Sequence, residues 1–242
     1  PGNNGADPMT LPGSVLSWLR ADDLRAALAA VQADPVLGAH VDRSRLGVVG
    51  FSAGGYTALL AAGARPDLQR LLAFCRAHPD DGVCRPQQEA ATHTMEARLA
   101  AATSPALAPW ISHSDDARAL PGVRAVFLLA PAIVQAFAPG QLSSLQLPVS
   151  IVLGDADKVA PPTSNGEAAQ ALIPGATLLR LADVGHYDFL STCTAAGVQR
   201  LPDLCTAATS TAGTHRRTVD AATGFFDAAL REPHDNEPLH LR

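Results

Sequence analysis

The 242-residue chain has no run of lysines and arginines, only 5% aromatic residues and no long apolar segment. A formal net charge of -5 without a basic stretch argues against nucleic acid or an anionic membrane surface as a partner. Crossing a bilayer takes about 20 consecutive apolar residues, so no membrane span is expected. No cysteine pair has the short spacing of a zinc site, and no cluster of residues indicates a metal, phosphate or cofactor site. With 47% hydrophobic and 17% charged residues, the chain can bury the core of one domain.

The four cysteines, Cys75, Cys84, Cys193 and Cys205, allow three pairings. Proximity favours Cys75–Cys84 and Cys193–Cys205, because each pair closes a short loop rich in proline, aspartate and glycine. Two bridges would imply an oxidising compartment, so that the protein is secreted or periplasmic. Four reduced, buried thiols are the alternative. A signal peptide removed on maturation would leave no trace in the sequence.

Strand and helix patterns alternate along the chain. A continuous apolar run bounded by turn signals predicts a strand buried on both faces at 45–51, and similar patterns predict buried strands within 123–131 and 147–157. A fourth strand followed by a loop is expected within 176–189. Helical periodicity predicts helices within 14–33, 53–63, 165–173 and 215–232, the last docking on the sheet through Val219, Ala222, Phe225, Phe226 and Leu230. The long insertion 64–121, broken by prolines, is expected to form a lid. This order predicts an α/β fold with a mostly parallel sheet, whose site lies beyond the carboxyl ends of the strands.

The stretch Gly50-Phe51-Ser52-Ala53-Gly54 fits the pattern G-x-S-x-G between a predicted strand and a predicted helix. In this context the serine lies on a strained turn with its hydroxyl exposed, and the flanking glycines avoid collisions with strand and helix. The Ala53 N–H would point into the same space and stabilise an oxyanion. A glycine-serine turn without chemistry is the alternative.

A serine hydroxyl becomes a nucleophile only when a base accepts its proton, and in this topology an acid and then a histidine follow the serine. Of the eight histidines, only His186 directly follows a predicted strand. Asp155 and Asp157 both follow the preceding strand. Asp157 is preferred because Gly154 begins the turn, so that a residue two or three positions later reaches the histidine. Asp155 is expected to cap the loop, and Asp183 is an outside candidate.

The segments GFSAGG, GDADKVAPP and GHYDF, in this order, resemble the α/β-hydrolase family. The longer stretches GVVGFSAGGYTALLAAGARPDL…FCRAHPDDGVC and FLSTC…LC resemble bacterial predicted dienelactone hydrolases, a branch similar to the platelet-activating-factor acetylhydrolases. The resemblance implies an α/β-hydrolase fold with Ser52 as nucleophile, Asp157 as acid and His186 as base, and it implies that both cysteine pairs are bridged. True dienelactone hydrolases use a cysteine where this chain has Ser52, so the resemblance does not define the substrate.

Two features of that family have no counterpart in the sequence. No His-Gly pair is present to supply the second oxyanion donor, and fewer strands are predicted than the family contains. The residues Pro1-Gly2-Asn3-Asn4 resemble the end of the family's fourth strand. We therefore expect residues 1–242 to form the C-terminal portion of one α/β-hydrolase domain, completed by an N-terminal segment or a second chain. The sheet would otherwise expose an edge.

Together these patterns predict a serine carboxylic-ester hydrolase that forms an acyl-enzyme on lipid-like, short-acyl or polyester substrates. Trp110 and Phe137 are candidates for an acyl or aromatic pocket, with ordinary core packing as an equal alternative. Arg20 is expected to pair with Asp22 or Asp23 and to have no catalytic role. An amidase or thioesterase would use the same triad, and a non-catalytic binding or assembly module is the alternative from another class.

Overall fold

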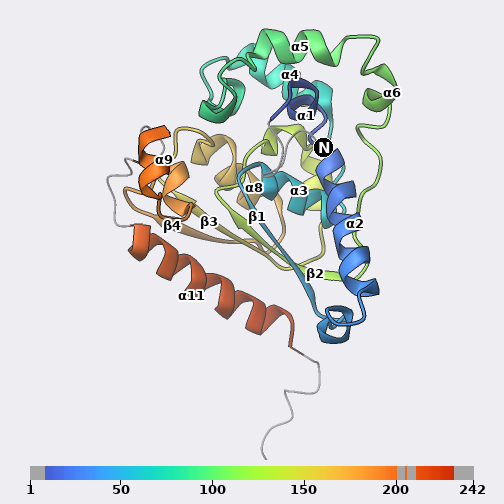
Figure 1. The fold of residues 1–242 in the computed structure, drawn as a ribbon, viewed down its shortest axis with the longest axis vertical. Coiled ribbons are helices and arrows are strands. Elements are labelled where there is room, and N and C mark those ends of the chain that lie inside the picture. The colour runs from blue at the N-terminus through green and yellow to red at the C-terminus, as the bar shows by residue number, and fades with distance from the viewer. Residues whose placement is uncertain (1–8, 201–204, 206–210, 232–242) are drawn as a thin grey trace, which may run out of the picture.

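The computed structural model describes residues 9–200, 205 and 211–231 (Figure 1). A single sheet of four parallel strands has the order β1-β2-β3-β4. The strands are β1 (Leu46–Phe51), β2 (Val123–Leu129), β3 (Val149–Gly154) and β4 (Thr177–Leu181). The predicted α/β class with a mostly parallel sheet is confirmed. All six residues of β3 are buried, including Ser150, as its mostly apolar pattern predicted.

The strand register aligns the carboxyl ends of the sheet. Phe51 at the end of β1 lies opposite Leu129 at the end of β2, and Gly154 at the end of β3 lies opposite Leu181 at the end of β4. The loops that leave these strands therefore meet at one edge, which is where parallel α/β sheets place their sites.

Helices connect the strands and cover the sheet. They are α1 (Leu11–Val15), α2 (Leu19–Ala33), α3 (Ala53–Ala61), α4 (Leu68–Ala77), α5 (Met95–Ala102), α6 (Ala108–Ile111), α7 (Pro139–Ser143), α8 (Gly166–Leu172), α9 (Ala195–Arg200) and α11 (Thr211–Ala229). The helix expected within 14–33 is interrupted between α1 and α2, where the buried Trp18 anchors the chain in the core. Three helices of the insertion 64–121, α4, α5 and α6, gather at the top of the molecule in Figure 1.

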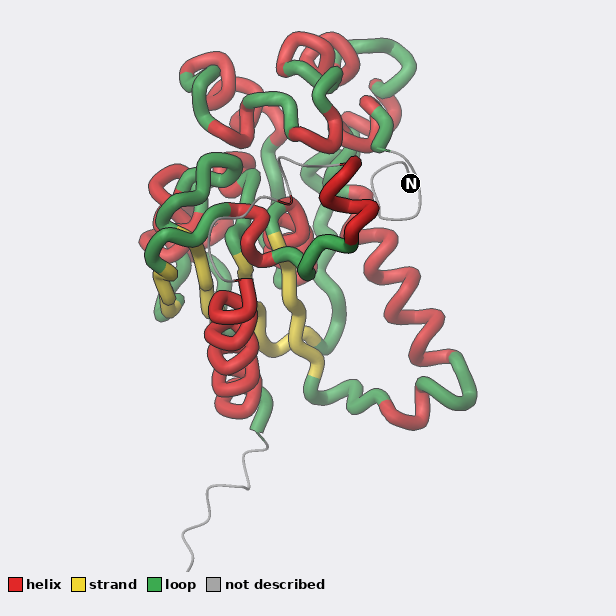
Figure 2. The backbone as a smooth tube through the Cα atoms, turned by 60° about the vertical axis from the view of Figure 1, so that its left-hand side comes forward, coloured by secondary structure: helices red, strands yellow, loops and turns green. Residues whose placement is uncertain are grey.

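The two faces of the sheet have different covers. On one face, α3 and α8 take part in the larger hydrophobic core, which includes Leu59, Leu128 and Ile151. On the other, α11 lies along the sheet (Figures 1 and 2). Its residues Phe225 and Phe226 pack on Phe127 of β2, with ring centroids 6.0 and 6.2 Å away.

The docking face of α11 differs from the prediction at Val219, and the predicted docking residue Leu230 lies just beyond the end of the helix. Val219 is 60% exposed, whereas Ala222, Phe225 and Phe226 contact the sheet as expected. Gly47 of β1 makes this contact possible, because a Cβ at that position would lie 2.4 Å from the ring of Phe226.

Strand β1 is an edge of the sheet within the described residues, paired on one side with β2. Its Val49 is 59% exposed, so the prediction that this strand is buried throughout is wrong, because the edge strand is only partly covered by the described residues. The strand end predicted at residues 1–4 lies outside the described residues. In the part of the chain that the structure describes, no helix is both long and apolar enough to cross a membrane.

Both favoured cysteine pairings are present as disulfides. Cys75 is bonded to Cys84, and Cys193 to Cys205. Two disulfides are compatible with an extracellular or periplasmic location, where oxidising conditions maintain such bonds.

Candidate active site

Ser52 occupies a strained turn between β1 and α3. Its φ and ψ angles are 55° and -124°, a positive φ that residues other than glycine rarely adopt. Gly50 is needed for this turn, since a Cβ there would lie 2.1 Å from the carbonyl oxygen of Gly54. The prediction that Gly54 also avoids a collision is wrong, because a Cβ on it would meet nothing within 4 Å. The tight position is instead Gly55, where a Cβ would lie 2.8 Å from the Cβ of Pro131.

The structure brings Ser52, His186 and Asp157 together at the carboxyl edge of the sheet. The Ser52 Oγ lies 2.8 Å from His186 Nε2, and His186 Nδ1 lies 2.7 Å from Asp157 Oδ2. An ionised carboxylate only accepts hydrogen bonds, so Nδ1 carries the ring proton and donates a hydrogen bond to Asp157. This leaves Nε2 free to accept the proton of the Ser52 hydroxyl, which is the tautomer that a general base requires.

Asp157 is fixed by its own loop. Its Oδ1 accepts hydrogen bonds from the backbone N–H groups of Val159, at 2.9 Å, and Ala160, at 2.8 Å. Both members of the acid–base pair are 4% exposed. The other carboxyl considered, Asp155, accepts the backbone N–H of Asp183 at 2.7 Å, so it binds the segment before His186 rather than the backbone of its own loop.

Ala53 is the first residue of helix α3, and its backbone N–H donates no hydrogen bond to a described residue. Ala53 also lines the pocket in front of Ser52. The first N–H groups of a helix have no partner within the helix and carry the positive end of its dipole. An oxyanion formed next to Ser52 would therefore find a free donor at Ala53.

The pocket at Ser52 has a volume of about 330 Å³. Five parts of the chain contribute to its wall: the Ser52 turn, the α1–α2 region with Met9, the insertion 64–121, Ala132 and Ile133 after β2, and Val159 after β3. Beyond the turn itself, the polar or charged side chains in its lining are Ser14, Ser17, Arg20, Gln87 and Arg98.

The two residues predicted to form the substrate pocket lie elsewhere. Trp110 on α6 is 53% exposed and is not among the residues that line the Ser52 pocket. Phe137 is 2% exposed and packs on Tyr56 with ring centroids 5.3 Å apart. Phe137 belongs to the core because the chain after β2 folds back under the insertion, where Pro66 and Phe137 form an antiparallel bridge.

Sequence reasoning missed two arginines of the pocket, Arg20 and Arg98. Burial lowers the pKa of Arg20, an effect that the charge of Asp23 opposes, and burial also lowers the pKa of Arg98. The Arg98 Nε is buried with no hydrogen-bond partner among the described residues. No described residue that lines the pocket is Asp or Glu. Neither arginine belongs to a motif, so no signal in the sequence distinguished them from other helical arginines.

No family model matches the chain, and no curated protein matches it. Among solved structures, the chain is similar to MGS-MChE2, an alpha/beta hydrolase enzyme from the metagenome of lagoon sediments at Mar Chica, Morocco. The identity is 15% and the TM-score 0.36, over 76% of this chain and 64% of that one. This chain therefore spans less than two thirds of the length of that enzyme.

Two further solved structures are similar. The esterase RhEst1 from Rhodococcus sp. ECU1013 is 16% identical, with a TM-score of 0.37 over 95% of this chain and 75% of that one. Est816, described as an N-acyl homoserine lactone degrading enzyme, is 21% identical, with a TM-score of 0.37 over 72% of this chain and 69% of that one.

Proposed function

We propose that the protein is a serine ester hydrolase of the α/β-hydrolase family, in which Ser52, His186 and Asp157 act as a catalytic triad. The observation that carries the proposal is the continuous hydrogen-bond chain from Ser52 Oγ through the imidazole to the buried carboxylate, with distances of 2.8 and 2.7 Å. The strained backbone of Ser52 supports it, because such strain is typical of functional positions.

In this reaction His186 Nε2 accepts the Ser52 proton as Oγ attacks the ester carbonyl. Asp157 holds the ring and stabilises its positive charge. The tetrahedral oxyanion forms next to the Ala53 N–H. His186 then protonates the leaving alcohol, and water, activated in the same way, releases the acid from the acyl-enzyme.

A second oxyanion donor belongs to the proposal. A strand from an N-terminal segment or a second chain would pair with β1, whose outer edge has no partner among the described residues, and its following loop would reach the site. One oxyanion donor changes the rate by about 10²–10³-fold, so the chain without this addition is expected to be a weak catalyst. The two disulfides support a secreted or periplasmic enzyme.

The lining of the pocket narrows the substrate class. Lipid-like, short-acyl and polyester substrates all fit an ester hydrolase, but the pocket wall carries the guanidinium of Arg20, in a chain whose net charge is -5. Arg98 adds positive charge to the wall, while its Nη2 donates to the backbone carbonyl oxygens of Cys84 and Arg85. A guanidinium binds a carboxylate with charge-assisted hydrogen bonds. The substrate is therefore an ester that carries an anionic group.

Labelling by a fluorophosphonate tests the triad. The wild-type chain in its complete assembly is expected to be labelled at Ser52, and Ser52→Ala is expected to lose both the label and p-nitrophenyl ester hydrolysis. An absence of label on Ser52 would favour the non-catalytic binding module. Matched p-nitrophenyl esters and anilides separate an esterase from an amidase, and faster cleavage of the anilides would overturn the ester assignment.

The substrate charge is tested with 3-acetoxybenzoate and its uncharged methyl ester. The ratio of kcat/KM for the two is expected to fall about tenfold in Arg20→Gln, as one charge-assisted contact is lost. Arg25→Gln, on the same helix but paired with Asp22, is the matched control and should keep the wild-type ratio. An unchanged ratio in Arg20→Gln would remove the anionic substrate class.

A further inference from the structure

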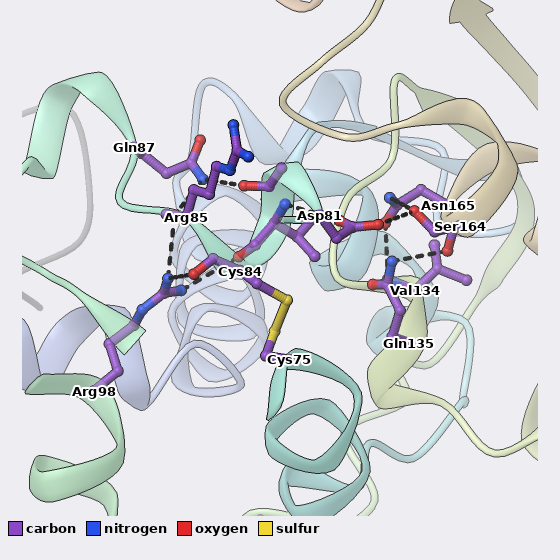
Figure 3. The surroundings of a disulfide bond; sticks show 12 residues. Cys75, Asp81, Cys84, Arg85, Gln87, Arg98, Val134, Gln135, Ser164 and Asn165 are labelled. Atoms are coloured by element: carbon purple, nitrogen blue, oxygen red, sulfur yellow. Dashed lines mark hydrogen bonds between the residues drawn. A yellow bond between two sulfur atoms is a disulfide. The ribbon is translucent and has the colours of Figure 1, made fainter. Parts of the chain in front are cut away.

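The disulfide Cys75–Cys84 lies beside the catalytic acid. Cys75 is in the last turn of α4, and Cys84 ends a short 3-10 segment, η2 (Gly82–Cys84). Both are buried, at 1% and 2% exposure, and they share a small apolar cluster with Ala160. Ala160 follows Asp157 by three residues and donates its N–H to that carboxylate. Figure 3 shows the bridge and the polar contacts around it.

The turn that the bridge closes rests on the backbone of the acid loop. A Cβ on Gly82 would lie 2.1 Å from the carbonyl oxygen of Lys158 and 2.5 Å from that of Val159. The two backbones are therefore in direct contact, with no room for a side chain between them. The Val159 N–H donates a hydrogen bond to Asp157 Oδ1, so a shift of Gly82 would change the orientation of the Asp157 carboxylate toward His186.

A side chain of the same turn makes a second link to the acid loop. Asp81 Oδ1 accepts the N–H of Val83 at 3.1 Å, and its Oδ2 accepts the hydroxyl proton of Ser164 at 2.6 Å. Ser164 ends the segment that leads from the acid loop into α8. Asp81 thus ties the disulfide loop to the far end of the segment that begins at Asp157 (Figure 3).

The opposite side of the loop faces the substrate pocket. Arg98 Nη2 donates to the carbonyl oxygens of Cys84, at 3.0 Å, and Arg85, at 3.2 Å. Gln87 Nε2 donates to the carbonyl oxygen of Gly82 at 3.1 Å. Arg98 and Gln87 both line the Ser52 pocket. The same loop therefore supports the catalytic acid on one side and the pocket wall on the other.

We propose that the Cys75–Cys84 disulfide is a positioning element of the active site, which presses the Asp81–Gly82 turn against the acid loop and keeps Asp157 aimed at His186. The inference rests on the proposed function, because aim matters only if the triad is catalytic. Misplacement of a catalytic group by about 1 Å can slow a reaction by about 10²-fold. Opening of the bridge by a dithiol, which supplies two electrons and two protons and becomes a cyclic disulfide, leaves two thiols and is expected to slow the enzyme.

The test compares the two bridges of the full chain. Cys75→Ala/Cys84→Ala is expected to lower kcat for p-nitrophenyl acetate at least tenfold, with KM changed less than threefold. The matched control is Cys193→Ala/Cys205→Ala, which opens a loop of similar length, 12 residues of separation against 9, and thus has a similar effect on the unfolded chain. It should keep kcat within twofold.

A spectroscopic signature separates aim from general stability. The downfield proton resonance of the His186 Nδ1–H in its hydrogen bond to Asp157 is expected to be lost or shifted when Cys75–Cys84 is open and retained in the control. Gly82→Ala, which keeps the bridge, serves if the double variant fails to fold. Its Cβ must push the Lys158 and Val159 backbone away, so kcat should again fall at least tenfold, whereas Gly140→Ala, with open space around it, should not change kcat.

The outcomes separate the two hypotheses. A wild-type protein with neither hydrolysis nor a fluorophosphonate label at Ser52 would remove the proposed function, and with it the inference. An active wild-type protein whose kcat and downfield resonance survive both the opened Cys75–Cys84 bridge and Gly82→Ala would overturn the inference alone. Equal losses of kcat from both opened bridges would also overturn it.

Discussion

The two edge strands of the sheet are built differently. The outer strand β4 carries Arg180, which is 53% exposed on its side chain and forms an ion pair with Glu167 of α8. The outer strand β1 has the sequence LGVVGF without a charged residue, and its Val49 is 59% exposed. Edge strands of natural proteins commonly carry charges that prevent pairing with other chains. β4 thus has the features of an edge strand that stays unpaired, whereas β1 has the features of a strand that pairs with a further strand.

The largest effect on stability is expected from a substitution at Gly47, where α11 already covers β1. Gly47 and Val49 lie on the same face of the strand, since side chains alternate, but Gly47 faces the ring of Phe226. Gly47→Val would force α11 away from the sheet and is expected to destabilise the protein by about 1–3 kcal/mol, as overpacking does. Urea unfolding followed by circular dichroism measures this. An unchanged midpoint would show that α11 is not seated on β1.

A smaller effect is expected from removing the charge on β4. Arg180→Val loses an exposed ion pair, which contributes about 0–1 kcal/mol, so the unfolding midpoint should fall slightly. The new apolar edge should increase self-association, as measured by sedimentation velocity. Arg180→Lys keeps the charge and is the control. A monomeric Arg180→Val at high concentration would show that charge does not protect this edge.

The smallest effect on folding is expected from Val49→Lys, which gives β1 the character of β4. Because Val49 is exposed, the free energy of unfolding should change by no more than about 0.5 kcal/mol. Self-association through β1 should decrease, and in the complete assembly ester hydrolysis should decrease because the added strand pairs less well. Val49→Thr, uncharged and similar in shape, should leave both unchanged. An assembly that tolerates Val49→Lys with full activity would argue against a strand at this edge.

The strand cores and the order of the three residues proposed as the triad were readable in the sequence for physical reasons. A strand buried on both faces is mostly apolar, as β2 is apart from Arg124 near its start and β3 apart from Ser150, so the pattern locates it. The turn at Ser52 requires a glycine at position 50, and this requirement makes the motif visible. Asp157 could be preferred over Asp155 because the length of the turn after Gly154 is a local property.

The pocket could not be predicted in the same way. Its wall combines α1, α2 and the insertion, and the contacts between these parts depend on packing between residues far apart in the chain. Arg20 and Arg98 come to line the same pocket only through that packing. Trp110 and Phe137 were predicted to line the pocket because they are aromatic, but Trp110 is exposed and Phe137 belongs to the core. Composition says little about which buried residue faces a cavity.

The backbone conformation of Ser52 affects the thermal stability of the protein. A positive φ at a residue with a side chain costs about 1–3 kcal/mol, a strain that glycine would relieve. Replacement of Ser52 by glycine should therefore raise the melting temperature while abolishing hydrolysis, whereas alanine, which keeps the Cβ, should abolish hydrolysis without that rise. The residue at the centre of the proposed chemistry is one whose loss would make the molecule sturdier.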